Sequence, residues 1–332
     1  MKQQKRWYKK FKQNRKAMFS LMFLSVIVFL SFTAEIWSNN KPLVMYWHQQ
    51  IYFPIFKSYH PSLFFQENIF VTDYRKINFA QSDWAVWPVN QWDPFESNSL
   101  VNHYPSAPSL NNWLGTDDRG RDVFSRLLYG FRYTIIYAFT VWFFSYLIGT
   151  VWGACQGYLG GKWDLIGSRL VEVFEMMPQL LLLITLISIF EPSIFLLVVF
   201  SVIFDWTGIY HYMRAQFLQL RHREYVESAR VLGASHSQII FKHILPNAIT
   251  PLITFSPFSI AANISGLALL DYLGLGMRAP TPSWGELMAQ SQKYFTVAEW
   301  LVWAPSIALL LVMVSLIHIG LAVKAAIAAE EL

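Results

Sequence analysis

The stretch from residue 224 to residue 247 reads EYVESARVLGASHSQIIFKHILPN and carries three signals of local structure. Gly233 suits the left-handed position that follows the end of a helix. Ser235 and Gln238 have the spacing of a capping box, which starts a helix. Pro246 limits that second helix, because a proline interrupts helical hydrogen bonding. The stretch therefore predicts two short helices joined by a bend at the glycine.

The first of these helices has an apolar stripe, formed by Tyr225, Val226, Ala229 and Leu232. A hairpin with such a stripe has two interpretations that spacing does not separate. In one, the hairpin is a knob that fits a groove of another protein. In the other, it is an amphipathic hairpin that lies on a membrane surface.

Long apolar segments lie on both sides of this stretch. A helix that crosses a bilayer needs about 20 apolar residues, and its backbone polar groups must be satisfied within the segment. Six segments meet these conditions, at residues 17–37, 133–158, 171–189, 193–212, 248–272 and 301–323. The sequence therefore predicts an all-α membrane protein with six transmembrane helices, five of which form a core at 133–323.

The composition agrees with a membrane protein. Hydrophobic residues make up 54% of the chain and charged residues 14%, whereas ordinary soluble domains have about 25% charged residues. Aromatic residues reach 17%, an excess that is typical of membrane–water boundaries. Cys155 is the one cysteine, so a disulfide within the chain is excluded.

The charges predict the orientation. The first sixteen residues contain eight Lys and Arg and no acid, and they lead directly into the apolar segment 17–37. A signal peptide is the alternative, but its apolar region is shorter and ends in a cleavage site. The positive-inside rule then places the basic tail 1–16, the loop 213–247 and the tail 324–332 in the cytoplasm. A nucleic-acid partner is not expected, since the basic run has no ordered aromatic face.

The segment 38–132 has a different character, with many tryptophans, prolines and asparagines. We expect an extracytoplasmic cap, with short strands at 52–56 and 84–89 that their prolines weaken. Its role is either structural or to dock a partner that delivers substrate. Its last part predicts an interfacial elbow in which Arg121, Arg126 and Arg132 are available to lipid headgroups.

Catalytic motifs are incomplete. Residues 155–163 approach a phosphate-binding loop but lack its first glycine and the Ser or Thr after Lys162. His222 has no second histidine at the spacing of a zinc site. Asp205 and Asp271 lie in apolar segments, where acids are functional candidates, but neither defines a reaction. We therefore expect a chain without a catalytic site, a metal site or a cofactor.

The stretch 224–247 resembles the EAA loop of the permeases of ATP-binding-cassette (ABC) importers. Its pattern places Glu227, Ala229, Gly233, Leu245 and Pro246 in register, whereas Ser228 and His243 depart from it. The resemblance implies a type I importer permease fold with an insertion between helices 1 and 2. It also implies that the loop docks in the cleft of a separate ATPase, with these ATPase-coupling residues: Glu227, Ser228, Ala229, Gly233, Leu245 and Pro246.

Two more segments, 113–130 and 280–287, are similar to dipeptide and oligopeptide permeases of the DppC/OppC type. Residues 40–44 and 52–54 resemble the microcin C and oligopeptide importer branch (YejE-type). The resemblance implies a bacterial inner-membrane subunit that imports peptides or peptide-like compounds by alternating access. Its implied partners are a second homologous permease, two nucleotide-binding ATPase subunits that bind the ATP, and a periplasmic substrate-binding protein.

Some alternatives remain open at this level. An ion-driven secondary transporter of small solutes would show repeated halves and paired intramembrane charges, which the sequence lacks. The cargo is a peptide, a peptide-like antibiotic or nickel, and the substrate-binding residues are unknown. Ser259, Asn263 and Ser265 either face a pore or form hydrogen bonds between helices.

Overall fold

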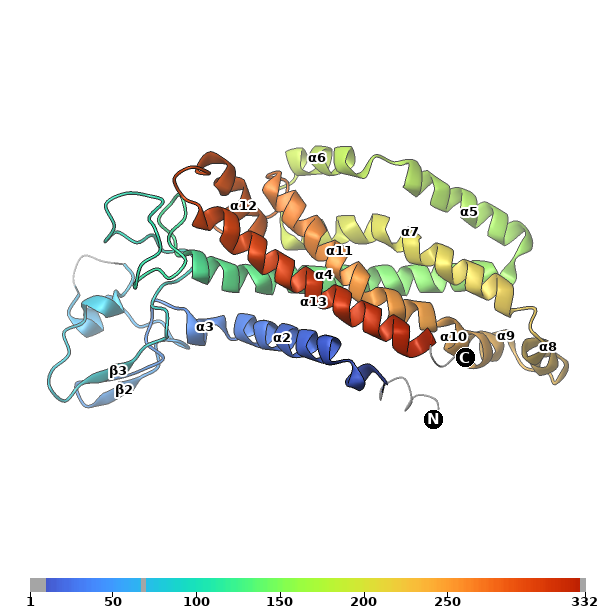
Figure 1. Ribbon diagram of the computed structural model, residues 1–332, viewed down its shortest axis with the longest axis horizontal. Coiled ribbons are helices and arrows are strands. Elements are labelled where there is room, and N and C mark those ends of the chain that lie inside the picture. The colour runs from blue at the N-terminus through green and yellow to red at the C-terminus, as the bar shows by residue number, and fades with distance from the viewer. Residues whose placement is uncertain (1–9, 67–69, 329–332) are drawn as a thin grey trace. The chain divides into compact units, whose positions relative to one another are not determined.

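The computed structural model describes residues 10–66 and 70–328 (Figure 1). Most of the predicted basic tail and the last four residues of the predicted C-terminal tail lie outside the described residues. The chain divides into two compact units. The first, which we call the helical unit, comprises Met1–Leu24, Thr134–Arg278 and Leu310–Leu332. The second, the insertion unit, comprises Ser25–Tyr133 and Ala279–Leu309.

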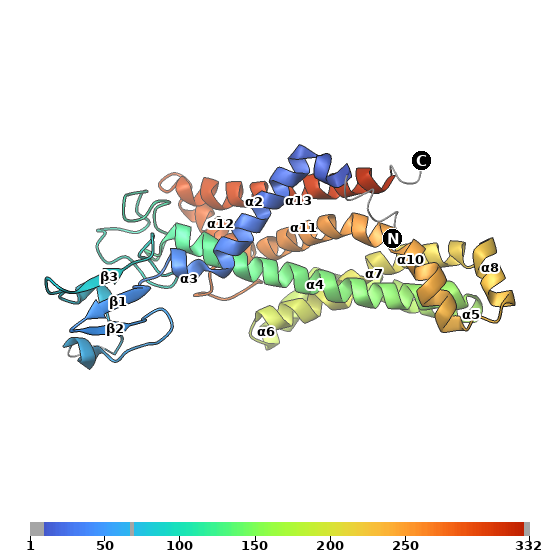
Figure 2. The same cartoon turned by 90° about the horizontal axis from the view of Figure 1, so that it is seen from below.

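Five helices of the described chain are long and apolar enough to cross a membrane. A sixth span results if one bent pair of helices is counted as a single crossing. The five are α2 (Arg15–Phe32), α4 (Val123–Leu159), α7 (Ile194–Leu220), α11 (Thr250–Tyr272) and α13 (Trp300–Ala328), shown in Figures 1 and 2. Each contains or overlaps a predicted segment, so the helical nature of these segments is confirmed.

The bent pair replaces the continuous helix that we expected at 171–189. It consists of α5 (Gly161–Met176) and α6 (Gln179–Ile189), whose axes differ in direction by 69°. The break lies at Met177, which is extended at φ −73° and ψ 129°, and at Pro178. A residue before a proline is pushed out of helical geometry, and the proline cannot donate a helical hydrogen bond. The expectation of a straight helix was wrong for this reason.

Within the helical unit, α4 and α7 approach closely along three glycines of α4. A β-carbon at Gly149 would lie 2.1 Å from Ile209 Cγ2, and one at Gly153 would lie 2.5 Å from the carbonyl oxygen of Tyr210. At Gly157, it would lie 2.5 Å from the carbonyl oxygen of Arg214. The four-residue spacing puts these glycines on one face of α4. Small residues at such spacing let the backbones of two membrane helices pack against each other. We call this contact the glycine seam.

The insertion unit contains a three-stranded antiparallel sheet in the order β2–β1–β3. Its strands are β1 (Val44–Trp47), β2 (Gln50–Tyr52) and β3 (Trp84–Val86). β3 confirms part of the strand predicted at 84–89. The strand predicted at 52–56 is confirmed only at its first residue, because the prolines at 54 and 88 lie beyond the paired residues. The other short elements of this unit are α3 (Ala34–Trp37), η1 (Pro61–Phe64), η2 (Tyr74–Lys76) and α12 (Trp284–Lys293).

A cluster of four charged residues lies inside the insertion unit, and we call it the buried charge cluster: Asp117, Arg121, Arg126 and Glu286. Arg121 Nε donates to Asp117 Oδ2 at 2.7 Å, and its Nη2 donates to Glu286 Oε1 at 3.1 Å. Arg126 has no exposed surface and pairs with the second oxygen of Glu286. Although burial alone lowers the pKa of Arg121, its attraction to Asp117 and Glu286 raises that pKa above its ordinary value.

The buried charge cluster corrects the predicted interfacial elbow. Arg121 and Arg126 were expected to reach lipid headgroups, but both are buried and paired with acids. Arg132 is half-buried and forms a bidentate ion pair with Glu35. Its Nη1 and Nη2 donate to Glu35 Oε1 and Oε2, both at 2.7 Å. The burial of Arg121 and Arg126 is tolerated because each guanidinium has carboxylate partners. Asp117 lies only four residues from Arg121, but Glu286 lies far away in sequence, and sequence spacing alone does not reveal such a partner.

Candidate functional site

The loop between α7 and α11 begins later than predicted. α7 stays helical to Leu220, so the loop starts at Arg221 instead of residue 213. Met213 and Phe217 are fully buried, which explains why the helix continues. Arg214, which falls within the predicted loop 213–247, lies in α7 and donates to both oxygens of Asp164 at 2.5 and 2.7 Å. We call residues 221–248 the loop from here on.

The predicted bend at Gly233 is confirmed. Helix α8 (Glu224–Val231) ends at Leu232, and Gly233 follows with φ +83°, in the left-handed region. The N–H of Ala234 donates to the carbonyl of Ala229 at 3.0 Å, which closes the end of the helix. A β-carbon at Gly233 would meet no atom within 4 Å. The backbone conformation therefore selects glycine here, and the space beside it is left open.

The second arm of the loop starts as predicted but continues further. Ser235 Oγ accepts from the N–H of Gln238 at 3.3 Å, and Gln238 Oε1 accepts from the N–H of Ser235 at 2.9 Å, which confirms the capping box. Helix α9 (His236–Gln238) then passes into a π-helical segment, η3 (Ile239–Ile244), and into α10 (Leu245–Ala248).

Pro246 does not end this arm, contrary to our expectation. It occupies the first turn of α10, where a proline is tolerated because its missing N–H would have no helical partner. The wide π turn lies just before it, with the N–H of Leu245 donating to the carbonyl of Ile240. The helical path therefore runs on toward α11.

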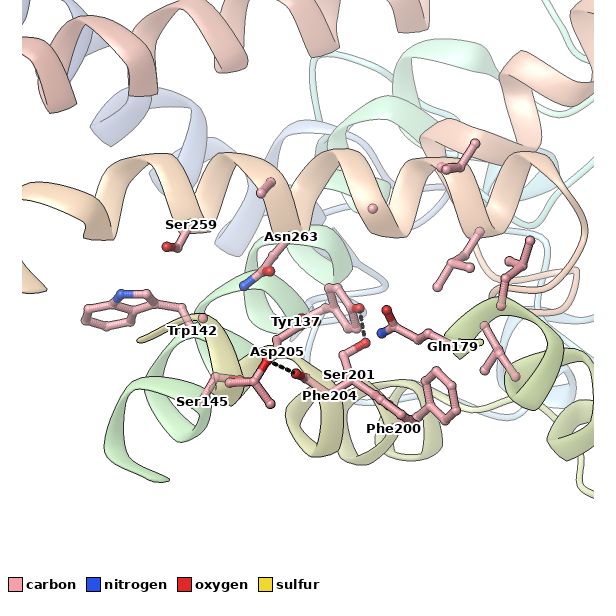
Figure 3. Close-up of a pocket in the computed structure, with 18 of the residues that line it drawn as sticks. Tyr137, Trp142, Ser145, Gln179, Phe200, Ser201, Phe204, Asp205, Ser259 and Asn263 are labelled. Atoms are coloured by element: carbon pink, nitrogen blue, oxygen red, sulfur yellow. Dashed lines mark hydrogen bonds between the residues drawn. The ribbon is translucent and has the colours of Figure 1, made fainter. Parts of the chain in front are cut away.

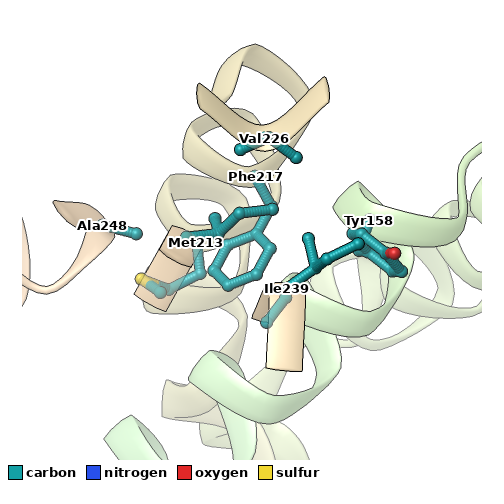
Figure 4. Packing of buried hydrophobic residues seen from close by; sticks show 8 residues of the cluster. Tyr158, Met213, Phe217, Val226, Ile239 and Ala248 are labelled. Carbon is teal, nitrogen blue, oxygen red and sulfur yellow. The ribbon is translucent and has the colours of Figure 1, made fainter. Parts of the chain in front are cut away.

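The inner face of the loop is anchored by an apolar cluster (Figure 4). Val226 from α8 and Ile239 and Ile244 from η3 are buried against the ends of α4 and α7. Those helices contribute four residues, Ala154, Tyr158, Met213 and Phe217. Full burial of each large apolar side chain contributes about 1.5–3 kcal/mol. The loop is thus packed onto the two helices of the glycine seam.

Polar contacts reinforce this anchoring. Tyr158 Oη lies 2.7 Å from His236 Nδ1, so α4 is joined to the start of α9. Arg221 Nη1 donates to the carbonyls of Gly157 and Tyr158 at 3.3 and 3.4 Å. These carbonyls belong to the last turn of α4, where a cation also interacts favourably with the helix dipole.

The outer face of the loop is apolar and exposed. Val231 and Leu232 are 87% and 86% exposed, and Phe241 is 67% exposed. We call residues 231–233 the loop tip. The stripe predicted on the first helix is therefore divided, since Val226 and Ala229 are buried within the chain whereas Leu232 is almost fully exposed. The signal for the exposed residues was present in the sequence as two adjacent apolar residues before a glycine.

The six predicted coupling residues fall into two groups. Ala229 is buried, and Leu245 packs against the apolar cluster. The other four, Glu227, Ser228, Gly233 and Pro246, are exposed. All six residues thus lie in one loop that has two faces. The inner face packs against α4 and α7, and the outer face exposes apolar surface that another molecule can contact.

The second candidate site is a cavity of about 560 Å³ within the helical unit, between α4, α6, α7 and α11 (Figure 3). Hydroxyl groups on its walls pair with each other. Tyr137 Oη lies 2.6 Å from Ser201 Oγ, and Tyr146 Oη lies 2.7 Å from Ser259 Oγ. Asn263 Nδ2 donates to the carbonyl of Ala138 at 3.2 Å.

The polar residues of the apolar segments differ in their surroundings, and Ser259 and Asn263 both line the cavity and form hydrogen bonds with α4. Asp205 lines the cavity as well. Ser265 does not, and its hydroxyl donates to Met313 Sδ at 3.3 Å, so it joins two helices. Asp271 accepts from the N–H of Met277 at 2.8 Å and holds the turn after α11. In residues 10–66 and 70–328, no group of three or more His, Cys, Asp or Glu side chains could hold a metal ion.

Comparisons with known proteins cover both sites. Residues 145–329 match the family described as "Binding-protein-dependent transport system inner membrane component". The "Inner membrane ABC transporter permease protein YejE" of Escherichia coli (strain K12) is 37% identical over 326 residues, covering 97% of this chain and 95% of that protein. The "Oligopeptide transport system permease protein OppC" of Bacillus subtilis (strain 168) is 34% identical, covering 64% of this chain and 69% of that protein.

Two more similarities concern the branch and the fold. The "Peptidoglycan transport system permease protein YejE" of Agrobacterium fabrum (strain C58 / ATCC 33970) is 35% identical, covering 96% of this chain and 91% of that protein. A chain of the inward-facing MetNI methionine ABC transporter superposes with a TM-score of 0.51 at 20% identity, covering 61% of this chain and 97% of that chain. This last similarity concerns the fold alone.

Proposed function

Because the chain belongs to the family of binding-protein-dependent transport system inner membrane components, we propose that it is a permease subunit of an ABC importer for peptides. The chain has the fold of a type I importer permease. Relatives named as oligopeptide, dipeptide and peptidoglycan permeases support peptides or peptide-like compounds as the cargo. In this proposal, ATP is bound and hydrolysed by two partner ATPase subunits, and this chain catalyses no reaction.

The construction of the loop carries this proposal. Its outer face has apolar side chains that are more than four-fifths exposed, which suits a protein partner. Its inner face is packed on α4 and α7 through the apolar cluster. A force applied at the loop tip is therefore transmitted to two membrane helices, because packed interiors move as a unit. We assign Glu227, Ser228, Ala229, Gly233, Leu245 and Pro246 to this coupling to the ATPase.

The orientation that we propose follows from the charges at one end of the helical unit. Phe11 and Ala17, near the start of the chain, pack against Ala322, Val323 and Ala326, near its end. The start of α2, the end of α13 and the loop lie at the same end of this unit (Figure 1). Basic residues are concentrated there, namely Lys10, Lys12, Arg15, Lys16, Arg223, Arg230 and Lys242. The positive-inside rule then puts this end in the cytoplasm and residues 38–132 in the periplasm as a cap.

The proposed mechanism is alternating access driven from outside the chain. A periplasmic binding protein delivers the peptide to a path formed by this chain and a second homologous permease. Closure of the two ATPases around ATP moves the surfaces on which the loops dock, and the helices then switch between outward- and inward-facing states. ATP shifts this equilibrium only as far as it binds one state more tightly than the other.

A purification followed by an uptake assay tests the proposal. The tagged chain is isolated in mild detergent, and co-purifying proteins are identified by mass spectrometry. We expect a second permease and one or two nucleotide-binding subunits, and we expect peptide uptake by vesicles to require internal ATP and to resist a protonophore. A monodisperse chain without an ATPase, in lipid nanodiscs as well, together with uptake that a protonophore abolishes, would instead indicate an ion-driven secondary transporter.

A further inference from the structure

Asp205 is the acidic residue among those that line the cavity. It lies on α7 together with Ser201, Phe204 and Gly208, at positions one helical turn apart, and all four line the cavity. Figure 3 shows Asp205 beside Ser201 and opposite Asn263 of α11. No Lys, Arg or His is found among the described residues of the lining. The cavity therefore combines aromatic and hydroxyl-bearing walls with one group that can carry a negative charge.

Asp205 shares the cavity with a neutral amide. Gln179, at the start of α6, lines the same cavity. In the described part of the chain, no cationic side chain forms an ion pair with Asp205, although eight other acids pair with arginines: Glu35, Asp73, Glu96, Asp117, Asp164, Glu172, Glu191 and Glu286. Ionisable groups in membrane segments normally pair or face a water-filled path, so an acid without a cation marks a place for a mobile positive charge.

The other polar side chains that line the cavity are neutral, including Trp142 Nε1 and Ser145 Oγ, which are buried without a hydrogen-bond partner among the described residues. The hydroxyls of Tyr137 and Ser201 satisfy each other, as do those of Tyr146 and Ser259. The amide of Asn263 donates to a backbone carbonyl of α4. These pairs hold the walls of the cavity together, whereas Asp205 is an exposed residue of the cavity lining. A volume of about 560 Å³ lies within the range of sites that enclose small organic ligands.

We infer that Asp205 binds the ammonium group of the transported peptide inside this cavity. The inference rests on the proposed function, because it assigns a contact on the path of the same cargo. A carboxylate and an ammonium form a charge-assisted hydrogen bond, which is stronger than one between neutral groups. The cavity thereby favours peptides with a free amino terminus over analogues of the same size that lack the amine.

Uptake by the complete importer tests this inference. Tri-alanine and propionyl-dialanine, which has a hydrogen in place of the amine, are offered to vesicles containing the importer, with the binding protein saturated by either peptide. We expect Asp205→Asn to lower the uptake of tri-alanine by about tenfold and to leave propionyl-dialanine almost unchanged. Asp205→Glu, which keeps the charge, should restore the preference for the amine. Glu172→Gln removes an acid of α5 that pairs with Arg169, outside the cavity, and is the matched control.

Each other result has a distinct meaning. Equal uptake of tri-alanine by the wild type and Asp205→Asn would overturn the inference while leaving the importer intact. A loss of uptake for both peptides would also overturn it, and it would identify a proton carrier if the pH dependence of uptake disappeared as well. If Asp205→Asn does not assemble, Asp205→Ser is the second neutral variant. Absence of ATP-driven uptake of any peptide by the wild type would count against the proposed function itself.

Discussion

The glycine seam and the loop tip both depend on glycine, but for opposite physical reasons. At Gly153, the helix conformation is ordinary, and the carbonyl of Tyr210 occupies the space in which a side chain would lie. At Gly233, the backbone is left-handed at φ +83°, and the space beside it is empty. In the seam, atoms of α7 fill the space beside each glycine. At the tip, no atom of the chain fills the space beside Gly233, as expected for a surface that contacts another protein. Substitutions at three positions test this contrast, in order of their expected effect on stability.

The strongest test concerns the buried charge cluster. Like the seam, this cluster has all its described contacts within the chain. Arg126→Met removes one of the two arginine partners of Glu286 and the donor to the carbonyls of Pro94, Pro280 and Thr281. Because the buried ion-pair network then loses one of its two cations, we expect a loss of about 3–5 kcal/mol in the free energy of unfolding. Stepwise unfolding in sodium dodecyl sulfate measures it.

The exposed residue Arg119 provides the matched control for this experiment. We expect Arg119→Met to change the free energy of unfolding by no more than about 0.5 kcal/mol. Equal stability of the two variants would contradict the view that the arginines of this segment serve as buried scaffold.

The next largest effect is expected in the glycine seam. Gly153→Ala places a methyl group 2.5 Å from the carbonyl oxygen of Tyr210, and the two helices must separate. We expect a loss of about 1–3 kcal/mol in the same unfolding measurement. Gly208→Ala is the control, since its added methyl group meets nothing within 4 Å, and it should stabilise the helix or leave it unchanged. A Gly153→Ala protein as stable as Gly208→Ala would show that the seam is not closely packed.

The smallest effect on stability, but a large one on transport, is expected at the loop tip. Gly233→Asn keeps the turn, because asparagine tolerates left-handed geometry, and should cost less than about 1 kcal/mol. We expect Gly233→Asp to insert in the membrane but to lose both coupled ATPase activity and uptake. Gly233→Asn should lose uptake as well, since its side chain enters the space reserved for the ATPase.

The two Gly233 variants separate the causes. If Gly233→Asn transports normally and Gly233→Asp does not, the charge or the turn matters and the empty space does not. Normal uptake by Gly233→Asp would rule out docking at the loop tip. Uptake is measured in vesicles, with the amount of each variant in the membrane determined in parallel.

The sequence predicts what depends on nearby residues. The left-handed glycine and the capping box were confirmed, because each involves residues within a few positions of each other. The membrane helices were predicted for the same reason, since length and apolar composition are local properties. The bend at Pro178 and the four-residue spacing of Gly149, Gly153 and Gly157 were readable as well, but neither was used.

Contacts between distant residues could not be predicted in this way. Arg126 was assigned to lipid headgroups because the sequence does not reveal that Glu286 lies beside it. Likewise, the sequence did not define a reaction for Asp205, and only the packing of four helices shows that it lines a cavity. The loop contains both kinds of feature. Its turn depends on neighbouring residues and was predicted, whereas which of its apolar residues are buried depends on distant contacts and was not predicted.

The π-helical segment Ile239–Ile244 has a consequence for how the loop is aimed. A π turn holds one residue more than an α-helical turn would over the same stretch. Deleting any one residue there would restore α-helical geometry and rotate everything before it by about 100° about the helix axis. The direction in which the tip points is thus set by the number of residues in this segment more than by their identity. In a lineage of such chains, single-residue deletions here would be eliminated even where every substitution is tolerated.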